Sequence, residues 1–178
     1  SEAGYLNHCL VCEQMGYAGS LIMSWFMELT NSIGETISHF AREEIAEKYV
    51  RPICEGDAYA SIGFTEEATG SDPEAIATTA LPEGDYYILN GSKRFISFSN
   101  QDGPAVVWAK DETGKLSTFV VEKNCDGYTA LKPWEMMGLT GQSLDFSMNN
   151  VQVPKGNMLG GKGEGFNILL RRIACEKI

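Results

Sequence analysis

Hydrophobic residues recur at helical spacing through the first third of the chain. A short first helix is followed by a mostly apolar stretch over residues 20–39, and then by a Glu- and Lys-rich segment over 41–49 that Pro52 breaks or turns. This pattern predicts a helical segment over residues 1–57. The apolar face of the first helix is made of residues four and three positions apart: Tyr5, Cys9, Cys12 and Met15.

From residue 58 the pattern changes to short apolar runs separated by turn residues. Asn90-Gly91 is the strongest short hairpin signal, and Pro82–Asp85 and Asp111–Gly114 are further turns. Short strands at this spacing predict an antiparallel β-barrel or sandwich over residues 58–160. The expected strands cover residues 59–64, 75–80, 86–89, 95–98, 105–110, 116–121, 128–131 and 144–153.

The last segment, residues 161–178, returns to helical spacing and ends without a capping residue. We therefore expect a helix that is truncated at its C-terminal end. Helices before and after a block of antiparallel strands place the protein in the α+β class. The chain also opens directly in a helical pattern, as a piece of a longer protein would.

The chain carries an excess of negative charge. Its 178 residues include 14 Lys and Arg against 24 Asp and Glu, which gives a net charge of −10. Because phosphate contacts need clustered Lys and Arg, we expect no nucleic-acid groove and no polybasic docking on a membrane. No apolar run reaches the ~18–20 residues of a membrane span. The first residues also do not have the basic and apolar regions of a signal peptide.

The cysteines argue against both a disulfide framework and a metal site. Five cysteines are scattered along the chain, an odd number that fits a reducing compartment. We therefore expect the cytoplasm, or the mitochondrial matrix in a eukaryote. Cys9 and Cys12 form a CxxC, but no second pair follows and the chain has only two histidines, so a four-ligand zinc site is hard to assemble.

A loop rich in Gly, Ser and Thr follows the first expected strand. Residues 65–72 read T-E-E-A-T-G-S-D, and peptide N–H groups in such a loop can bind phosphate oxygens where Gly70 permits close approach. Taken alone, the loop is better explained as a strand connection with an Asx or Ser turn. The motifs that precede and follow this loop in the sequence favour the binding interpretation instead. Seven motifs follow one another along the chain, at residues 42–49 with Pro52 and Gly56, 65–72, 89–97, 119–123 with Gly127, 137–138, 151–160 and 163–166.

In this order the motifs resemble the acyl-CoA dehydrogenase family. The family pattern includes T-E-x-x-x-G-S-D, L-N-G-x-K-x-(W/F)-I-(T/S), V-P-x-x-N-x-L-G and G-x-G-F, and the chain matches each of them. The alternative, chance similarity in a generic β-barrel, must explain seven motifs in one order. The resemblance implies the end of an N-terminal helical domain at 1–57, a β-barrel middle domain at 58–160 and the start of a C-terminal helical domain at 161–178.

The resemblance further implies a binding site for FAD. Phe95 would pack its ring against the isoalloxazine, and Ser97 would hydrogen-bond near the flavin N5. The alternative for both is simple strand alternation, with Phe95 in the core. Ser71 would face both pyrophosphate and substrate, whereas Ile62 departs from the family's usual aromatic or polar residue. The implied cofactor-binding residues are Ile62, Phe64, Thr65, Gly70, Ser71, Phe95, Ile96 and Ser97.

Two residues near the end of the chain are implied to act on the substrate. Glu176 falls where the isovaleryl- and long-chain-specific branches of the family place the base that removes the α-proton. In much of the family the base lies later, and an exposed Glu paired with a neighbouring Lys or Arg is the alternative for Glu176. Lys177 is the implied CoA-binding residue beside Ser71, although it replaces the family's usual Arg, as Ala174 replaces its usual Asp.

The implied activity of the parent enzyme is oxidation of the Cα–Cβ bond of an acyl-CoA in fatty acid metabolism. A base abstracts the α-proton while hydride passes to the flavin. The resemblance also implies an electron-transfer flavoprotein as partner and a homotetrameric parent, and we expect the fragment itself to be inactive. Two alternatives stay open: a flavoprotein oxidase or monooxygenase on the same fold, and a non-catalytic interaction module that retains the fold.

Overall fold

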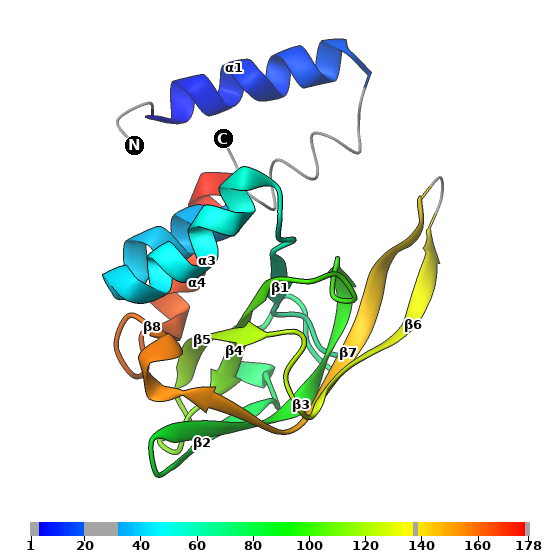
Figure 1. Cartoon of the computed structure of the whole chain (residues 1–178). Helices are drawn as coiled ribbons and strands as arrows, with labels where there is room; N and C mark the ends of the chain where they lie inside the picture. Colours follow the sequence, from blue (N-terminus) through cyan, green and yellow to red (C-terminus); the bar gives the residue numbers. More distant parts are fainter. Residues whose placement is uncertain (1–3, 20–31, 137–138, 177–178) are drawn as a thin grey trace.

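The computed structural model describes residues 4–19, 32–136 and 139–176, and its first elements are helices (Figure 1). Helix α1 spans Gly4–Tyr17, residues 32–40 are helical, and α3 spans Glu43–Glu55. The predicted helical segment is thus confirmed over its described residues.

Helix α3 continues through Pro52, so the break expected at this residue is wrong. Tyr49 and Ile53 are both buried and hold this end of the helix against the core, while Pro52 removes only one helix N–H group. The helix ends instead at Gly56, which has a left-handed φ of 83°. Its N–H donates to the Ile53 carbonyl at 3.2 Å, an ordinary glycine ending for a helix.

The strands form one sheet in the order β6-β7-β3-β2-β4-β5-β8, with β1 paired to β4. Most pairs are antiparallel, but β1 and β2 run parallel to β4. These two parallel pairs make the sheet mixed, and among the described strands its order is open at β6 and β8, so it does not close into a barrel. The predicted α+β class, with helices before and after a mostly antiparallel block of strands, is confirmed. Alternation predicts the face that a residue takes but not the neighbouring strand. The strands are β1 (Ser61–Gly63), β2 (Thr79–Glu83), β3 (Tyr86–Ser97), β4 (Pro104–Lys110), β5 (Leu116–Glu122), β6 (Tyr128–Met136), β7 (Leu139–Pro154) and β8 (Met158–Leu159).

The predicted hairpin at Asn90-Gly91 is wrong, because both residues lie within β3. Gly91 marks a close approach of two segments instead, since a Cβ there would lie 2.8 Å from the Thr78 Cα. The Asn90 side chain accepts a hydrogen bond from the Asn150 N–H at 2.8 Å, beside a register shift between β3 and β7. The turn between β2 and β3 lies earlier, at Gly84, whose φ is 54°.

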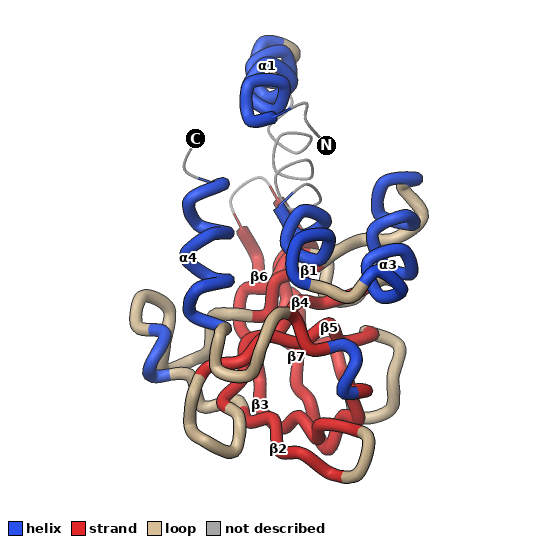
Figure 2. The backbone as a smooth tube through the Cα atoms, turned by 90° about the vertical axis from the view of Figure 1, so that its left-hand side faces the viewer, coloured by secondary structure: helices blue, strands red, loops and turns tan. Residues whose placement is uncertain are grey.

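Helices cover one side of the sheet, and Figure 2 shows them gathered at one end of the molecule with the strands at the other. Strand β4 lies between the two parts and is buried on both faces. Val106 and Trp108 pack toward the helices, whereas Ala105, Val107 and Ala109 pack among the strands. A strand buried on both faces has a continuous apolar sequence, as β4 does. The helix-side cluster also contains Ile33, Ile37, Tyr49, Ile53 and, from α4 (Gly165–Glu176), Ile168 and Leu169.

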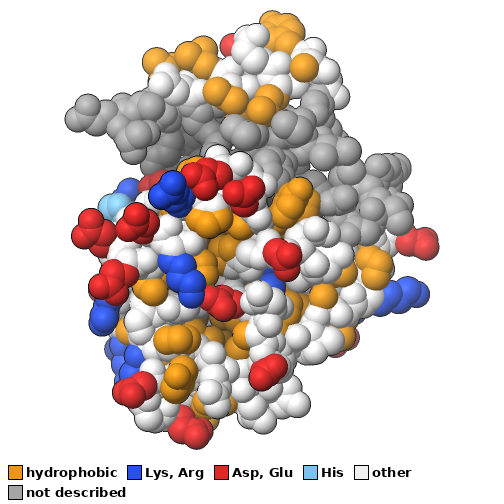
Figure 3. All heavy atoms as spheres, viewed as in Figure 1, with side chains coloured by type: hydrophobic (Ala, Val, Ile, Leu, Met, Phe, Trp, Pro, Cys, Tyr) orange, Lys and Arg blue, Asp and Glu red, His pale blue; other side chains and the backbone are white. Residues whose placement is uncertain are grey.

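The surface charges, the helices and the cysteines bear on the expectations from composition. Acidic and basic side chains are interspersed over the face in Figure 3, without a broad basic patch on that face. No helix in the described part of the chain is long and apolar enough to cross a membrane. Likewise, no group of three or more His, Cys, Asp or Glu among the described residues could hold a metal ion. The described cysteines Cys9, Cys12, Cys54 and Cys125 form no disulfide.

Candidate functional site

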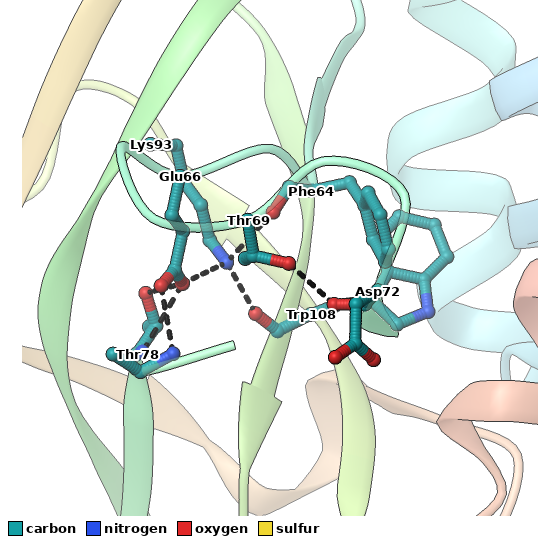
Figure 4. Close-up of polar contacts among 8 residues, drawn as sticks. Phe64, Glu66, Thr69, Asp72, Thr78, Lys93 and Trp108 are labelled. Atoms are coloured by element: carbon teal, nitrogen blue, oxygen red, sulfur yellow. Dashed lines mark hydrogen bonds and ion pairs between the residues drawn. The ribbon is translucent and has the colours of Figure 1, made fainter. Parts of the chain in front are cut away.

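A buried ion pair fastens the loop after β1 to the sheet (Figure 4). Lys93 Nζ on β3 lies 2.7 Å from Glu66 Oε1, and the two side chains are 0% and 6% exposed. The same carboxylate accepts hydrogen bonds from Thr78 Oγ1 at 2.5 Å and from the N–H groups of Ala77 and Thr78 at 2.7 and 3.1 Å. The loop over residues 64–78 therefore closes around Glu66.

Lys93 also joins this loop to β4. Its Nζ donates to the Phe64 carbonyl at 3.3 Å and to the Trp108 carbonyl at 2.7 Å. Burial lowers the pKa of Lys93 to about 8, against the opposing effect of the Glu66 charge. Burial alone would raise the pKa of Glu66, but the charge of Lys93 and the surrounding donors hold it below its ordinary value. Both groups are therefore charged at neutral pH.

Neither Glu66 nor Lys93 is among the site residues predicted from the sequence. A signal was present, because alternation along β3 places Lys93 on the same face as the buried Tyr87 and Leu89. A lysine at an inward position needs a partner of opposite charge. The glutamate of the loop motif is that partner.

Strand β3 bulges where the predicted flavin-facing residues lie. Its register against β7 shifts between Lys93 and Ile96, so Arg94 and Phe95 together face Asp145. Phe95 has a left-handed φ of 60° and is 54% exposed. A bulge redirects side chains in this way, and the alternative that placed Phe95 in the core is wrong. Ile96 is 4% exposed, so only its backbone can face a ligand.

Hydrogen bonds bring the loop and the bulge together. Arg94 N donates to the Thr65 carbonyl at 2.8 Å, and Ser61 Oγ donates to the Ser97 carbonyl at 2.8 Å. Within the described residues, the hydroxyls of Thr65, Ser71 and Ser97 make no hydrogen bond. An exposed aromatic ring beside unpartnered hydroxyls suits a flat heteroaromatic group with polar edges. The residues present therefore fit FAD.

The remaining predicted cofactor residues lie on either side of this centre. Ile62 and Phe64 are half-buried against the helix-side cluster, where the Phe64 ring meets Trp108 edge-on with centroids 5.9 Å apart. Gly70 is exposed, and a Cβ there would meet only Thr65 Cγ2, at 3.9 Å. Steric crowding among the described residues therefore does not require glycine at this position.

The end of the loop contains the Asx turn that was the alternative explanation of the motif. Asp72 Oδ1 accepts a hydrogen bond from Glu74 N at 3.0 Å and caps the short helix η1 (Pro73–Ala75). Thr69 Oγ1 donates to the Asp72 carbonyl. Ser71 is exposed between them and its hydroxyl takes no part in the turn.

The two residues predicted to act on the substrate at the end of the chain are Glu176 and Lys177. Glu176 is the last residue of α4, and its side chain is not among those described. Lys177 lies outside the described residues. The roles of both stay predictions.

Two models of one protein family match the chain. The acyl-CoA dehydrogenase N-terminal domain matches residues 1–57, and the acyl-CoA dehydrogenase middle domain matches residues 61–151. The chain belongs to the acyl-CoA dehydrogenase family. It spans about half the length of the curated relatives it matches.

Individual relatives agree with the family models. The chain is 34% identical to the caffeyl-CoA reductase–Etf complex subunit CarC of Acetobacterium woodii over an alignment of length 184, which covers 100% of this chain and 48% of that protein. A glutaryl-coenzyme A dehydrogenase solved with glutaryl-CoA is 28% identical, with a TM-score of 0.90 over 97% of this chain and 45% of that one. A Mycobacterium smegmatis glutaryl-CoA dehydrogenase solved with FADH2 is 25% identical, with a TM-score of 0.79 over 86% of this chain and 40% of that one.

Proposed function

We propose that the chain is the flavin-facing part of an FAD-dependent acyl-CoA dehydrogenase that oxidises the Cα–Cβ bond of an acyl-CoA. The observation that carries the proposal is the exposed Phe95 ring on its bulge, near Thr65 and Ser97, whose hydroxyls make no hydrogen bond within the described residues. The neighbour solved with FADH2 supports the cofactor. When bound, FAD supplies the acceptor for the hydride that leaves the substrate.

The residues of this chain bind and orient in this proposal. Phe95 stacks against the flavin ring, and Thr65 and Ser97 hydrogen-bond to its polar edge. Ser71, exposed in the loop, contacts pyrophosphate and substrate. The backbone of Ile96, Ile62 on β1 and the loop residues Phe64 and Gly70 complete the wall. An aromatic plate and fixed donors pre-organise the cofactor, whereas free hydroxyls in water would have to be ordered first.

Proton removal is assigned to Glu176, and CoA binding to Lys177 with Ser71. A carboxylate is too weak a base for an ordinary α-proton, so donors to the thioester carbonyl and the exclusion of water must assist it. The remainder of the protein supplies those features in this proposal. The domain division at residues 57 and 160, with the final segment opening a further helical domain, belongs to the same proposal.

The partners and setting of the parent enzyme are proposed on the same basis. An electron-transfer flavoprotein accepts the electrons, a proposal that the Etf complex of the Acetobacterium woodii relative supports. The parent forms a homotetramer, acts in fatty acid metabolism and lies in the cytoplasm or, in a eukaryote, the mitochondrial matrix. The same relative, a reductase, favours a second candidate activity at this site, reduction of an enoyl-CoA.

The proposal is tested on the full-length parent protein, refolded with excess FAD. We expect visible flavin absorbance. An acyl-CoA should bleach it under anaerobic conditions if the enzyme is a dehydrogenase, and an enoyl-CoA should restore it in the reduced enzyme if the enzyme is a reductase. Phe95→Ala should weaken FAD binding, whereas Tyr86→Ala, which removes a 43% exposed ring from the far end of β3, should not. Absence of flavin absorbance in the wild-type protein would contradict the proposal. Rapid reoxidation by air would favour the oxidase alternative.

A further inference from the structure

Asp145 on β7 lies opposite a bulge in each of its two neighbouring strands. The β3 bulge presents Arg94 and Phe95 to it. The register of β6 against β7 shifts at the same place, between Ala130 and Pro133. A bulge leaves backbone groups outside the regular ladder and turns the side chains near it. The sheet is therefore interrupted on both sides of this one carboxylate.

The Asp145 carboxylate gathers donors from both bulged strands. Its Oδ1 accepts hydrogen bonds from Phe95 N at 3.1 Å and from Trp134 Nε1 at 2.7 Å. Its Oδ2 lies 3.4 Å from Arg94 Nε, and the Asp145 side chain is 23% exposed. Since the bulge removes the Phe95 N–H from the strand ladder, Asp145 supplies the acceptor that this group needs.

These contacts hold the Phe95 ring, the Trp134 ring and the Arg94 guanidinium side by side as one surface. The Phe95 and Trp134 ring centroids are 4.9 Å apart, with an interplanar angle of 50°. The Arg94 Cζ lies 5.5 Å from the Phe95 centroid and 5.0 Å from the Trp134 centroid, within the range of cation–π contact. The Phe95 side of this face is open to solvent.

We propose that Asp145 is a positioning residue of the flavin site, which fixes the outward setting of Phe95 with Trp134 as a supporting ring. The inference rests on the proposed function. The left-handed φ of Phe95 is an unfavourable conformation for an aromatic residue, and such conformations persist only where surrounding contacts enforce them. Asp145 provides that contact directly, through the Phe95 N–H, and indirectly, through the Trp134 and Arg94 side chains.

The test compares three variants of the full-length protein with a matched control. Asp145→Ala removes every acceptor, Asp145→Asn keeps an oxygen for the two N–H donors, and Trp134→Phe keeps a ring but removes the indole N–H. The control, Glu135→Ala, removes an exposed carboxylate that makes no hydrogen bond within the described residues. Three properties are measured: FAD affinity by flavin fluorescence, the visible spectrum of bound flavin, and thermal stability without FAD.

Loss of the two hydrogen bonds that the Asp145 carboxylate accepts should weaken FAD binding by about 10- to 100-fold in Asp145→Ala. Asp145→Asn should recover most of that loss, and Trp134→Phe should lose about 3- to 10-fold. The bound spectrum should change in Asp145→Ala because the ring against the flavin has moved, a change that a loss of stability alone does not produce. Glu135→Ala should match the wild type.

Wild-type affinity and spectrum in Asp145→Ala would overturn the inference and leave the proposed function standing. If that variant does not fold, Trp134→Phe decides: wild-type affinity and spectrum in this variant would overturn the inference. A wild-type protein that binds no FAD would overturn the proposed function and this inference with it.

Discussion

Replacing Lys93 by Met should destabilise the chain strongly. Met has a similar length but no charge, so the substitution leaves the Glu66 carboxylate, 6% exposed, without its ion-pair partner. It also removes the donor to the Phe64 and Trp108 carbonyls. Breaking one side of a buried ion pair typically costs about 3–5 kcal/mol of unfolding free energy. We expect a loss of this size, measured by urea denaturation followed by circular dichroism.

Lys48→Met is the matched control. Lys48 also forms an ion pair with a glutamate, Glu122, but the two side chains are 57% and 43% exposed. An exposed pair contributes only about 0–1 kcal/mol, because water solvates both charges once the pair is broken. The two lysine variants therefore separate the effect of burial from that of charge removal.

The pH dependence of Lys93→Met gives a second check. In the wild type the pKa of Glu66 is lowered, so its contribution to stability is present above the ordinary glutamate value and is lost as the pH falls. Without Lys93, burial still raises this pKa while the lowering effect of the lysine charge is lost, so the pKa of Glu66 is higher in the folded variant than in the wild type. The variant therefore gains less stability than the wild type as the pH rises. The loss caused by Lys93→Met should be larger at about pH 7 than at about pH 4.5. An equal loss at both pH values, no larger than that of Lys48→Met, would refute this account of the pair.

Three further predictions concern catalysis, packing and cofactor binding. Glu176→Gln in the full-length enzyme should keep FAD and acyl-CoA binding but slow turnover by at least ~10²–10⁴-fold in stopped-flow reduction of the flavin, and a near-normal rate would place the base elsewhere. Gly63→Ala should cost about 1–3 kcal/mol in urea denaturation, because its Cβ would lie 2.9 Å from Phe146 Cζ and 3.1 Å from Val107 Cγ2, whereas Gly70→Ala has room. The 178-residue chain should fold but bind FAD weakly or not at all, because hydrogen bonds open to water contribute only ~0.5–1.5 kcal/mol each. Stoichiometric binding at micromolar concentration in a flavin-fluorescence titration would sink that last prediction.

The sequence predicted the large features of the fold because they follow from local periodicity. The change from helical to alternating pattern near residue 58 and the final helix both appear in the structure. The parallel pairing of β1 and β2 with β4 could not be predicted in this way, since parallel neighbours are set by contacts between residues far apart in the chain. The hairpin predicted at Asn90-Gly91 was wrong for a related reason. The close approach of Thr78, a tertiary contact, explains why a glycine stands at position 91.

The candidate site was predictable only where a motif carried it. The motif pointed to Phe95, and the structure adds why its ring is exposed: a bulge that no alternation pattern reveals. Asp145 gave no sequence signal, because an Asp between Leu144 and Phe146 reads as an ordinary outward residue of a strand. Its role depends on two register shifts that exist only once the sheet is assembled.

Trp108 links the loop over residues 64–78 to the start of α4, and this contact matters when the chain is fused to parts of another protein. Its ring packs against Phe64 at the start of the loop over residues 64–78, and its indole N–H donates to the Gly165 carbonyl at 2.9 Å, at the first residue of α4. Gly165 itself admits no side chain, since a Cβ would lie 2.7 Å from the Leu116 carbonyl carbon. A chimera that grafts the downstream helices of another enzyme after residue 165 keeps this joint intact. A junction placed before Gly165 leaves it to the grafted segment to accept the Trp108 indole N–H and fit against Leu116, so the exchange would also disturb the ring that packs against Phe64.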